Sequence, residues 1–184
     1  MDVLYITGRG GSLNKGLAAY LANSVQGFEG IAVDTLFLKR RPLEQVEFIR
    51  QKMVEDTTRL VIANSYGAYL VLHALAQIED FIPENVLLLS PLLGVGRAQG
   101  GFYMNIPPLL KRLEEAFSVE AVMRPTSIKF LIGELDKQIS TDQVSFVDEY
   151  FGLGSVQVCP GEGHMLSPQA IQKVLYTFEE LFWC

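Results

Sequence analysis

The sequence predicts an α/β fold, a three-layer α/β/α sandwich built on a mainly parallel sheet of six strands. Short β-branched runs alternate with amphipathic stretches along the chain. Within these runs, polar residues do not alternate with apolar ones, which is typical of strands covered on both faces. Of the 184 residues, 49% are apolar and 20% are charged. We therefore expect one domain over residues 1–184 with a substantial core.

The expected strands are short apolar runs. They lie at residues 3–7, 31–38, 60–63, 86–89, 128–132 and 156–159. In parallel sheets of this kind, ligands bind at the carboxyl ends of the strands. We therefore expect the chemistry in the loops that follow the first, third, fifth and sixth strands.

Helices are expected in the intervening stretches. They lie around residues 17–21, from 42 onward, at 68–78, 107–117 and 141–151, and from 167 onward. Pro42 suits the first turn of its helix. Ser140 and Gln143 have the spacing of a capping box. The stretch 68–78 is apolar almost all round, which predicts a helix packed on several sides.

Charge and cysteine content exclude several classes of protein. The chain has 15 basic and 21 acidic residues, a net charge of −6, so nucleic acid is not an expected partner. The basic residues 39–41 are interpreted as a solvated loop. Cys159 and Cys184 form neither a disulfide framework nor a metal-binding spacing. No signal peptide and no membrane span are recognised, which favours a cytoplasmic protein.

A candidate nucleophile lies in the segment Ala-Asn-Ser-Tyr-Gly at residues 63–67. Ser65 stands between an expected strand and an expected helix, with a small residue two positions away on each side. A tight strand-to-helix turn holds such a serine in a strained conformation and exposes its hydroxyl. The N–H of Tyr66 would then point toward a developing oxyanion. A serine that only caps the helix fits the same local pattern.

The two histidines are the candidates for a general base. His73 lies inside the apolar helix and is interpreted as a packed side chain. His164 follows the sixth strand in the segment Gly-Glu-Gly-His-Met, at the same sheet edge as Ser65. Glycines allow the backbone to turn sharply there and to present the ring. His164 is therefore the expected base.

A carboxylate is needed to orient the imidazole of His164. Asp136 follows the fifth strand and is our choice, because its distance beyond the strand end lets it reach the next loop. Glu134 and Asp142 are rivals for this role, and a simple turn aspartate is a further interpretation of Asp136.

The order of Ser65, Asp136 and His164, each after a strand, resembles that of the α/β-hydrolase superfamily over nearly the whole chain. The resemblance implies that fold without its usual N-terminal antiparallel strands. The size of the chain is similar to that of small serine hydrolases that include the retinoblastoma-binding-protein-like group, although their Leu-x-Cys-x-Glu segment has no counterpart here. Ala63 replaces the usual glycine, and Asn64 stands where many relatives have histidine.

The resemblance also assigns a role to the glycine-rich loop 7–12. In this superfamily the second oxyanion donor comes from that position, so an amide of Arg9 or Gly10 is expected there. The loop partly matches a dinucleotide-binding fingerprint at Gly8 and Gly10. Leu13 occupies the third glycine position, so a nicotinamide or flavin is not expected.

The connection 94–126 is too long for a simple turn and lies where lids are inserted in this superfamily. The expected pocket wall is a group of apolar side chains next to glycines. Its members are Phe102, Tyr103, Met104 and Ile106. Alternatively, this stretch only covers the sheet.

Together these features predict a serine hydrolase that cleaves a small or medium carboxyl ester or thioester through an acyl-enzyme. The expected partner is a small-molecule acyl substrate, and no metal or organic cofactor is required. Two alternatives stay open: an acyltransferase that uses the same triad, and a non-catalytic interaction protein on a hydrolase scaffold.

Overall fold

The computed structural model describes residues 2–25, 27–54, 58–79, 83–93 and 107–178. In this part of the chain a six-stranded parallel sheet has the order β2-β1-β3-β4-β5-β6. The strands are β1 (Asp2–Ile6), β2 (Phe28–Ile31), β3 (Thr58–Asn64), β4 (Asn85–Leu89), β5 (Ser127–Gly133) and β6 (Val156–Cys159).

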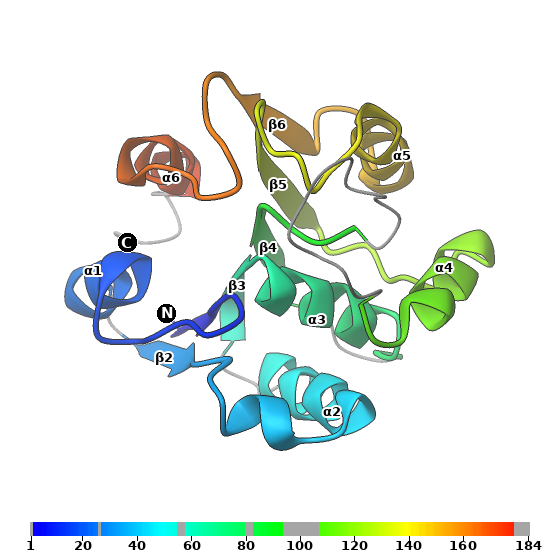
Figure 1. Cartoon of the computed structure of the whole chain (residues 1–184), viewed down its shortest axis with the longest axis horizontal. Coiled ribbons are helices and arrows are strands. Elements are labelled where there is room, and N and C mark those ends of the chain that lie inside the picture. Colours follow the sequence, from blue (N-terminus) through cyan, green and yellow to red (C-terminus); the bar gives the residue numbers. More distant parts are fainter. Residues whose placement is uncertain (1, 26, 55–57, 80–82, 94–106, 179–184) are drawn as a thin grey trace.

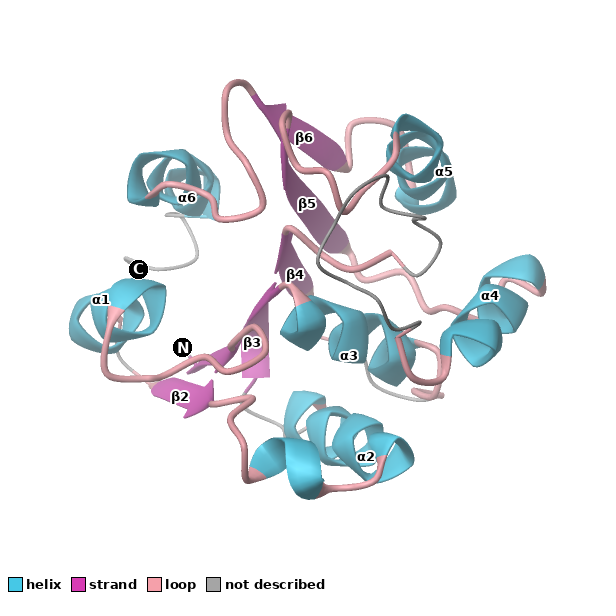
Figure 2. Cartoon of the chain, in the orientation of Figure 1, coloured by secondary structure: helices cyan, strands magenta, loops and turns pink. Residues whose placement is uncertain are grey.

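Helices cover both faces of this sheet (Figures 1 and 2). On one face, α1 (Gly16–Ser24) and α6 (Pro168–Leu175) bury Leu21 and Val174 against the strands. On the other face lie α2 (Pro42–Met53), α3 (Tyr66–Leu75), α4 (Leu110–Ser118) and α5 (Thr141–Phe151), which share the larger core. The three layers confirm the predicted fold class.

The predicted position of the second strand was wrong. β2 ends at Ile31, where the expected strand 31–38 begins. β1 ends at Ile6, so beyond Ile31 the chain has no strand to pair with. The N–H of Val33 instead donates to the Thr7 hydroxyl (2.8 Å), and the chain then forms a 3-10 helix, η1 (Phe37–Lys39). Val33 and Phe37 are buried although they lie outside any strand. Their burial accounts for the apolar run that predicted a strand here.

Most other expected elements are confirmed. α5 and β6 have the predicted bounds, and Ser140 and Gln143 form the predicted capping box. α3 begins at Tyr66, two residues earlier than expected, and α4 begins at Leu110, three residues later. The expected pocket wall at 102–106 lies outside the described residues. Within the described ranges, no helix has the length and apolar character that a membrane crossing requires.

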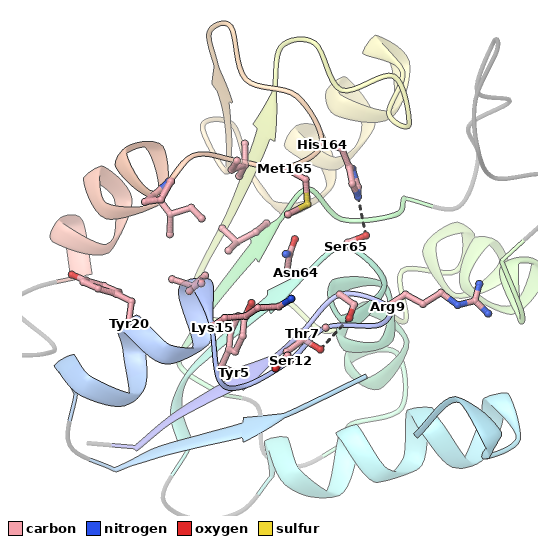
Figure 3. Close-up of a pocket in the computed structure, with 18 of the residues that line it drawn as sticks. Tyr5, Thr7, Arg9, Ser12, Lys15, Tyr20, Asn64, Ser65, His164 and Met165 are labelled. Atoms are coloured by element: carbon pink, nitrogen blue, oxygen red, sulfur yellow. Dashed lines mark hydrogen bonds between the residues drawn. The ribbon is translucent and has the colours of Figure 1, made fainter. Parts of the chain in front are cut away.

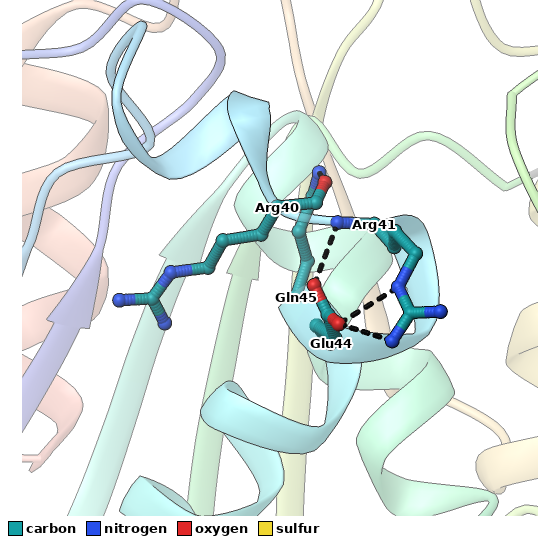
Figure 4. A network of polar contacts seen from close by, with 4 residues as sticks. All are labelled: Arg40, Arg41, Glu44 and Gln45. Carbon is teal, nitrogen blue, oxygen red and sulfur yellow. Dashed lines mark hydrogen bonds and ion pairs between the residues drawn. The ribbon is translucent and has the colours of Figure 1, made fainter.

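The basic residues 39–41 are exposed, as expected, and Arg41 belongs to a polar network at the start of α2 (Figure 4). The Glu44 carboxylate accepts the backbone N–H of Arg41 (3.0 Å) and pairs with the guanidinium of the same residue. Gln45 is buried, and its amide donates to the Arg40 carbonyl (2.8 Å). The Gln45 side-chain oxygen accepts the Tyr66 hydroxyl (3.0 Å), which connects α2 to the turn that contains Ser65.

Candidate active site

Ser65 occupies a strained turn between β3 and α3. Its backbone has φ 51° and ψ −115°, a conformation that L-residues rarely adopt. The Ser65 N–H donates to the Leu89 carbonyl (2.8 Å), which ties the turn to β4. A Cβ on Gly67 would overlap the backbone at the end of β1, whereas Ala63 is accommodated with no exposed surface. The close approach of β1 therefore requires glycine only on the helical side of the serine.

His164 lies within hydrogen-bond distance of this serine. The distance from Ser65 Oγ to His164 Nε2 is 2.9 Å (Figure 3). The loop that carries the ring is held by acidic side chains: Glu134 accepts the Gly161 N–H (2.9 Å), and Glu162 accepts both the N–H (2.8 Å) and the hydroxyl of Ser167. The loop also packs closely on Gly133, the last residue of β5.

Asp136 completes a hydrogen-bonded chain of three side chains. Its Oδ2 lies 2.8 Å from His164 Nδ1, and its side chain is fully buried. Its Oδ1 accepts the Gln138 N–H (2.9 Å), so both carboxylate oxygens have a partner. The rival Glu134 is engaged with the loop at Gly161 instead, and Asp142 is exposed at the start of α5.

The second histidine lies elsewhere. His73 is buried in α3, with its ring edge-on to Tyr69 at 4.6 Å between centroids. Burial lowers the pKa of His73 to about 4, with a smaller contribution from the charge of Arg112. A neutral imidazole that packs inside a helix layer agrees with the interpretation made from the sequence.

The two expected sources of the second oxyanion donor differ in their surroundings. The Gly10 N–H donates to the Val33 carbonyl (2.7 Å), so this amide already has an acceptor. The Arg9 N–H has no hydrogen-bond partner among the described residues. The loop also approaches the serine closely, since a Cβ on Gly8 would lie 3.3 Å from Ser65 Cβ. Tyr66 is the first residue of α3, so its N–H is at the helix N-terminus.

Ser65 and His164 open onto a cavity of about 690 Å³. It lies between the loop after β1, the start of α1 and the segment that leads into α6 (Figure 3). The sequence did not single out the other side chains of this lining. They include Tyr5, Lys15, Leu17, Tyr20, Leu166 and Ile171. Only the nearness of α1 to the glycine-rich loop could have pointed to Lys15, Leu17 and Tyr20.

The side chains around the cavity indicate which ligands and which chemistry the site can accommodate. No group of three or more histidine, cysteine, aspartate or glutamate side chains in the described ranges has a metal-binding arrangement. The cavity wall is mainly apolar with a few hydroxyl, amide and basic groups. A hydroxyl, an imidazole and a buried carboxylate in series can move a proton from the hydroxyl to the ring during attack on an electrophile.

Comparisons with solved structures connect this fold to known hydrolases. A monoacylglycerol lipase from Paleococcus ferrophilus has a TM-score of 0.67 at 15% identity, with 97% of this chain and 92% of the lipase aligned. Esterase PE8 gives 0.61 at 13% identity, with 98% and 92% aligned. The peroxisomal α/β-hydrolase Lpx1 from Saccharomyces cerevisiae gives 0.69 at 11% identity, with 98% and 75% aligned.

At these identities the likeness shows the fold, which is the α/β-hydrolase fold. The sequence matches no protein-family model, and no curated protein is detectably similar to it in sequence. The three structures do not bear on the narrower resemblance to the retinoblastoma-binding-protein-like group, which stays a prediction.

Proposed function

We propose that this α/β-hydrolase-fold protein is a serine hydrolase that cleaves a small or medium carboxyl ester or thioester. The observation that carries the proposal is the continuous hydrogen-bonded series from Ser65 through His164 to the buried Asp136, at 2.9 and 2.8 Å. The cavity beside Ser65 gives a substrate access to the serine hydroxyl. The lipase and esterase names of two structures with this fold agree with an ester substrate.

In the first step, the Ser65 oxygen attacks the acyl carbon while His164 Nε2 accepts the hydroxyl proton. Asp136 accepts a hydrogen bond from Nδ1–H, so it fixes the tautomer whose Nε2 lone pair faces the serine. It also stabilises the imidazolium that forms. Because the Asp136 side chain is fully buried, water competes little for this interaction.

The negative charge that develops on the carbonyl oxygen needs nearby donors. The Tyr66 N–H at the start of α3 is one, and the Arg9 N–H is the second. Gly10 is not included, because its N–H already donates to Val33. Donors that are fixed before the reaction stabilise the oxyanion without reorganisation.

Collapse of the tetrahedral intermediate breaks the bond to the alcohol or thiol, which leaves with the proton from His164. A water molecule then attacks the acyl-enzyme and gives its proton to the same nitrogen. Release of the carboxylic acid returns Ser65 to its hydroxyl form. Every step uses groups of this chain and water.

Labelling with a fluorophosphonate, read by intact mass, tests the proposal without knowledge of the substrate. We expect one adduct on the wild type, none on Ser65→Ala, and an unchanged adduct on the control Ser90→Ala. An adduct that maps to Ser12, Ser90 or Ser167 would overturn the assignment of the nucleophile. Absence of any adduct on the folded protein would favour the non-catalytic alternative.

A further inference from the structure

The lining of the cavity beside Ser65 has an unusual charge balance for this chain. The chain as a whole has 21 acidic and 15 basic residues, yet no aspartate or glutamate is among the described residues that line the cavity. The basic side chains of the lining are Lys15 and Arg9. Asp136 lies behind His164 with its side chain fully buried, and donors engage both of its oxygens. The lining therefore favours an anion.

Of these two basic side chains, Lys15 is directed at the cavity. In Figure 3 its side chain extends from the start of α1 toward the end that contains Asn64 and Ser65, whereas the Arg9 side chain points away. The Arg9 guanidinium lies 5.8 Å from the centroid of the Tyr66 ring. Lys15 makes no ion pair with any residue that the structure describes. Its ammonium is thus available to a ligand.

Other polar groups of the same cavity add hydrogen-bond donors to its lining. Burial raises the pKa of Tyr5 to about 12, so its hydroxyl stays protonated at neutral pH. The Asn64 side chain, which lines the same cavity, offsets part of this rise. The Ser12 hydroxyl lines the same cavity. A single ammonium with neutral donors matches a group with one negative charge, such as a carboxylate.

The rest of the wall limits where such a charge can lie. Leu17, Leu166 and Ile171 are apolar and line the cavity together with Lys15. A substrate part that fills this volume is therefore a short apolar chain or ring that ends in its charged group.

We propose that the ester substrate carries a carboxylate on the part that occupies this cavity, and that Lys15 binds this carboxylate while the ester carbonyl lies at Ser65. The inference rests on the proposed function and adds a substrate class to it. The carboxylate can belong to the acyl part or to the alcohol part of the ester, and the experiment separates these two sources.

Two matched pairs of esters provide the test. The acyl pair is 4-nitrophenyl hydrogen adipate and 4-nitrophenyl hexanoate. The leaving-group pair is the butyrate ester of 4-hydroxybenzoate and that of 4-hydroxybenzamide. The readout is the ratio of kcat/KM for the anionic ester to that for the neutral ester, measured in the wild type, Lys15→Gln, Lys15→Glu and the control Lys111→Gln, which changes an exposed lysine of α4.

We expect this ratio to fall about fivefold in Lys15→Gln for one of the two pairs, as for a largely exposed ion pair, and to fall further in Lys15→Glu. Lys111→Gln keeps the wild-type ratio. Added salt lowers the ratio in the wild type, because it screens the ammonium. The pair that responds identifies the part of the substrate that occupies the cavity. Ratios that are the same in the wild type and both Lys15 variants would overturn the inference while leaving ester hydrolysis intact.

A binding measurement keeps the inference testable if turnover is absent. Saturation-transfer NMR with monomethyl adipate and with 4-hydroxybenzoate is recorded on Ser65→Ala and on Ser65→Ala/Lys15→Gln. Loss of binding of either probe in the double variant supports the carboxylate site independently of catalysis. Equal signals in both proteins, or no binding of either probe, would contradict it. Failure of the proposed function itself is recognised separately, by the absence of fluorophosphonate labelling.

Discussion

Ser65, the proposed nucleophile, and Ser90 occupy similar turns in this fold and differ in their surroundings. They follow the adjacent strands β3 and β4, and both have positive φ, 51° and 42°. Ser90 has no exposed surface, and its hydroxyl has no partner among the described residues. Ser65 lies beside His164 and borders the cavity. Both serines thus have a strained backbone. They differ in whether the hydroxyl has a hydrogen-bond partner and in its access to the cavity.

The carboxylate that orients His164 can be identified by two isosteric variants. We expect Asp136→Asn to lower kcat by up to about 10⁴-fold, because the amide favours the wrong tautomer of the ring while the geometry is kept. Glu134→Gln, the matched control, should have a much smaller effect, since Glu134 supports the loop through Gly161. Ester kinetics and far-UV circular dichroism on both variants check this. A larger loss in Glu134→Gln would move the role to that residue.

His73 makes stability depend on acid. Its pKa is about 4 in the folded protein against an ordinary value of 6.5, so below pH 6.5 the unfolded chain binds a proton that the folded chain does not. Stability is therefore fully present above pH 6.5 and falls as the pH drops toward 4, by about 3 kcal/mol in total. We expect His73→Leu to flatten the pH dependence of the free energy of unfolding between pH 7.5 and 4.5, measured in urea.

A core truncation serves as the control for this effect. Val147→Ala, at a buried position of α5, should lower the free energy of unfolding by a similar amount at every pH in that range. Curves for the wild type and His73→Leu that run parallel would show that His73 is not the source of the acid sensitivity.

At the scale of elements, the site depends on how closely the chain segments approach one another. The His164 loop packs on the end of β5 so tightly that a Cβ on Gly133 would lie 2.5 Å from the Glu162 carbonyl oxygen. At the other end of the site, α2 supports the turn at Ser65 through the Gln45–Tyr66 hydrogen bond (3.0 Å). The strands bring Ser65, Asp136 and His164 to one edge of the sheet. These contacts between segments then determine the distances between the three side chains.

Gly133 offers a direct test of this packing. We expect Gly133→Ala to displace the His164 loop and to lower kcat/KM by about 10²-fold, the usual cost of a misplacement near 1 Å. The matched control is Gly163→Ala in the same loop, where an added Cβ meets nothing within 4 Å, so its activity should stay close to that of the wild type. Thermal unfolding measured alongside separates a displaced loop from a destabilised fold. Equal activity in the two variants would refute the packing argument.

At the scale of the whole molecule, the site lies where loops from one edge of the sheet meet the helices of one face. The groups follow β1, β3, β5 and β6, and residues of α1 and α6 contribute to the lining of the cavity. Its volume of about 690 Å³ lies within the range of small-molecule sites. The described part of the site thus has room for a short acyl chain.

The volume of this cavity predicts a preference for acyl length. We expect kcat/KM for 4-nitrophenyl esters to rise from acetate to butyrate or hexanoate and then to level off or fall, because each buried methylene contributes only about 0.8 kcal/mol while space remains. Leu166→Trp fills part of the cavity and should lower the rate on hexanoate more than that on acetate. The control Leu153→Trp changes a side chain that is 91% exposed in the loop before β6.

Two outcomes would count against this cavity as the acyl site. A steady rise in kcat/KM through palmitate would require a longer groove than the described residues provide. An unchanged length profile in Leu166→Trp would place the acyl chain elsewhere, for example at the predicted wall of Phe102 and Met104, which the described residues do not include.

The sequence by itself determined the parallel sheet, the bounds of α5 and β6, and the candidates Ser65, His164 and Asp136. Apolar periodicity and turn residues are local properties, and a serine between a strand and a helix is visible in five residues. The end of β2, the contact between Asp136 and His164, the commitment of the Gly10 N–H to Val33, and the cavity with Lys15 were decided by tertiary structure. Each of these depends on which distant segments lie side by side, because strand pairing, hydrogen-bond partners and enclosed volume are properties of two or more segments together.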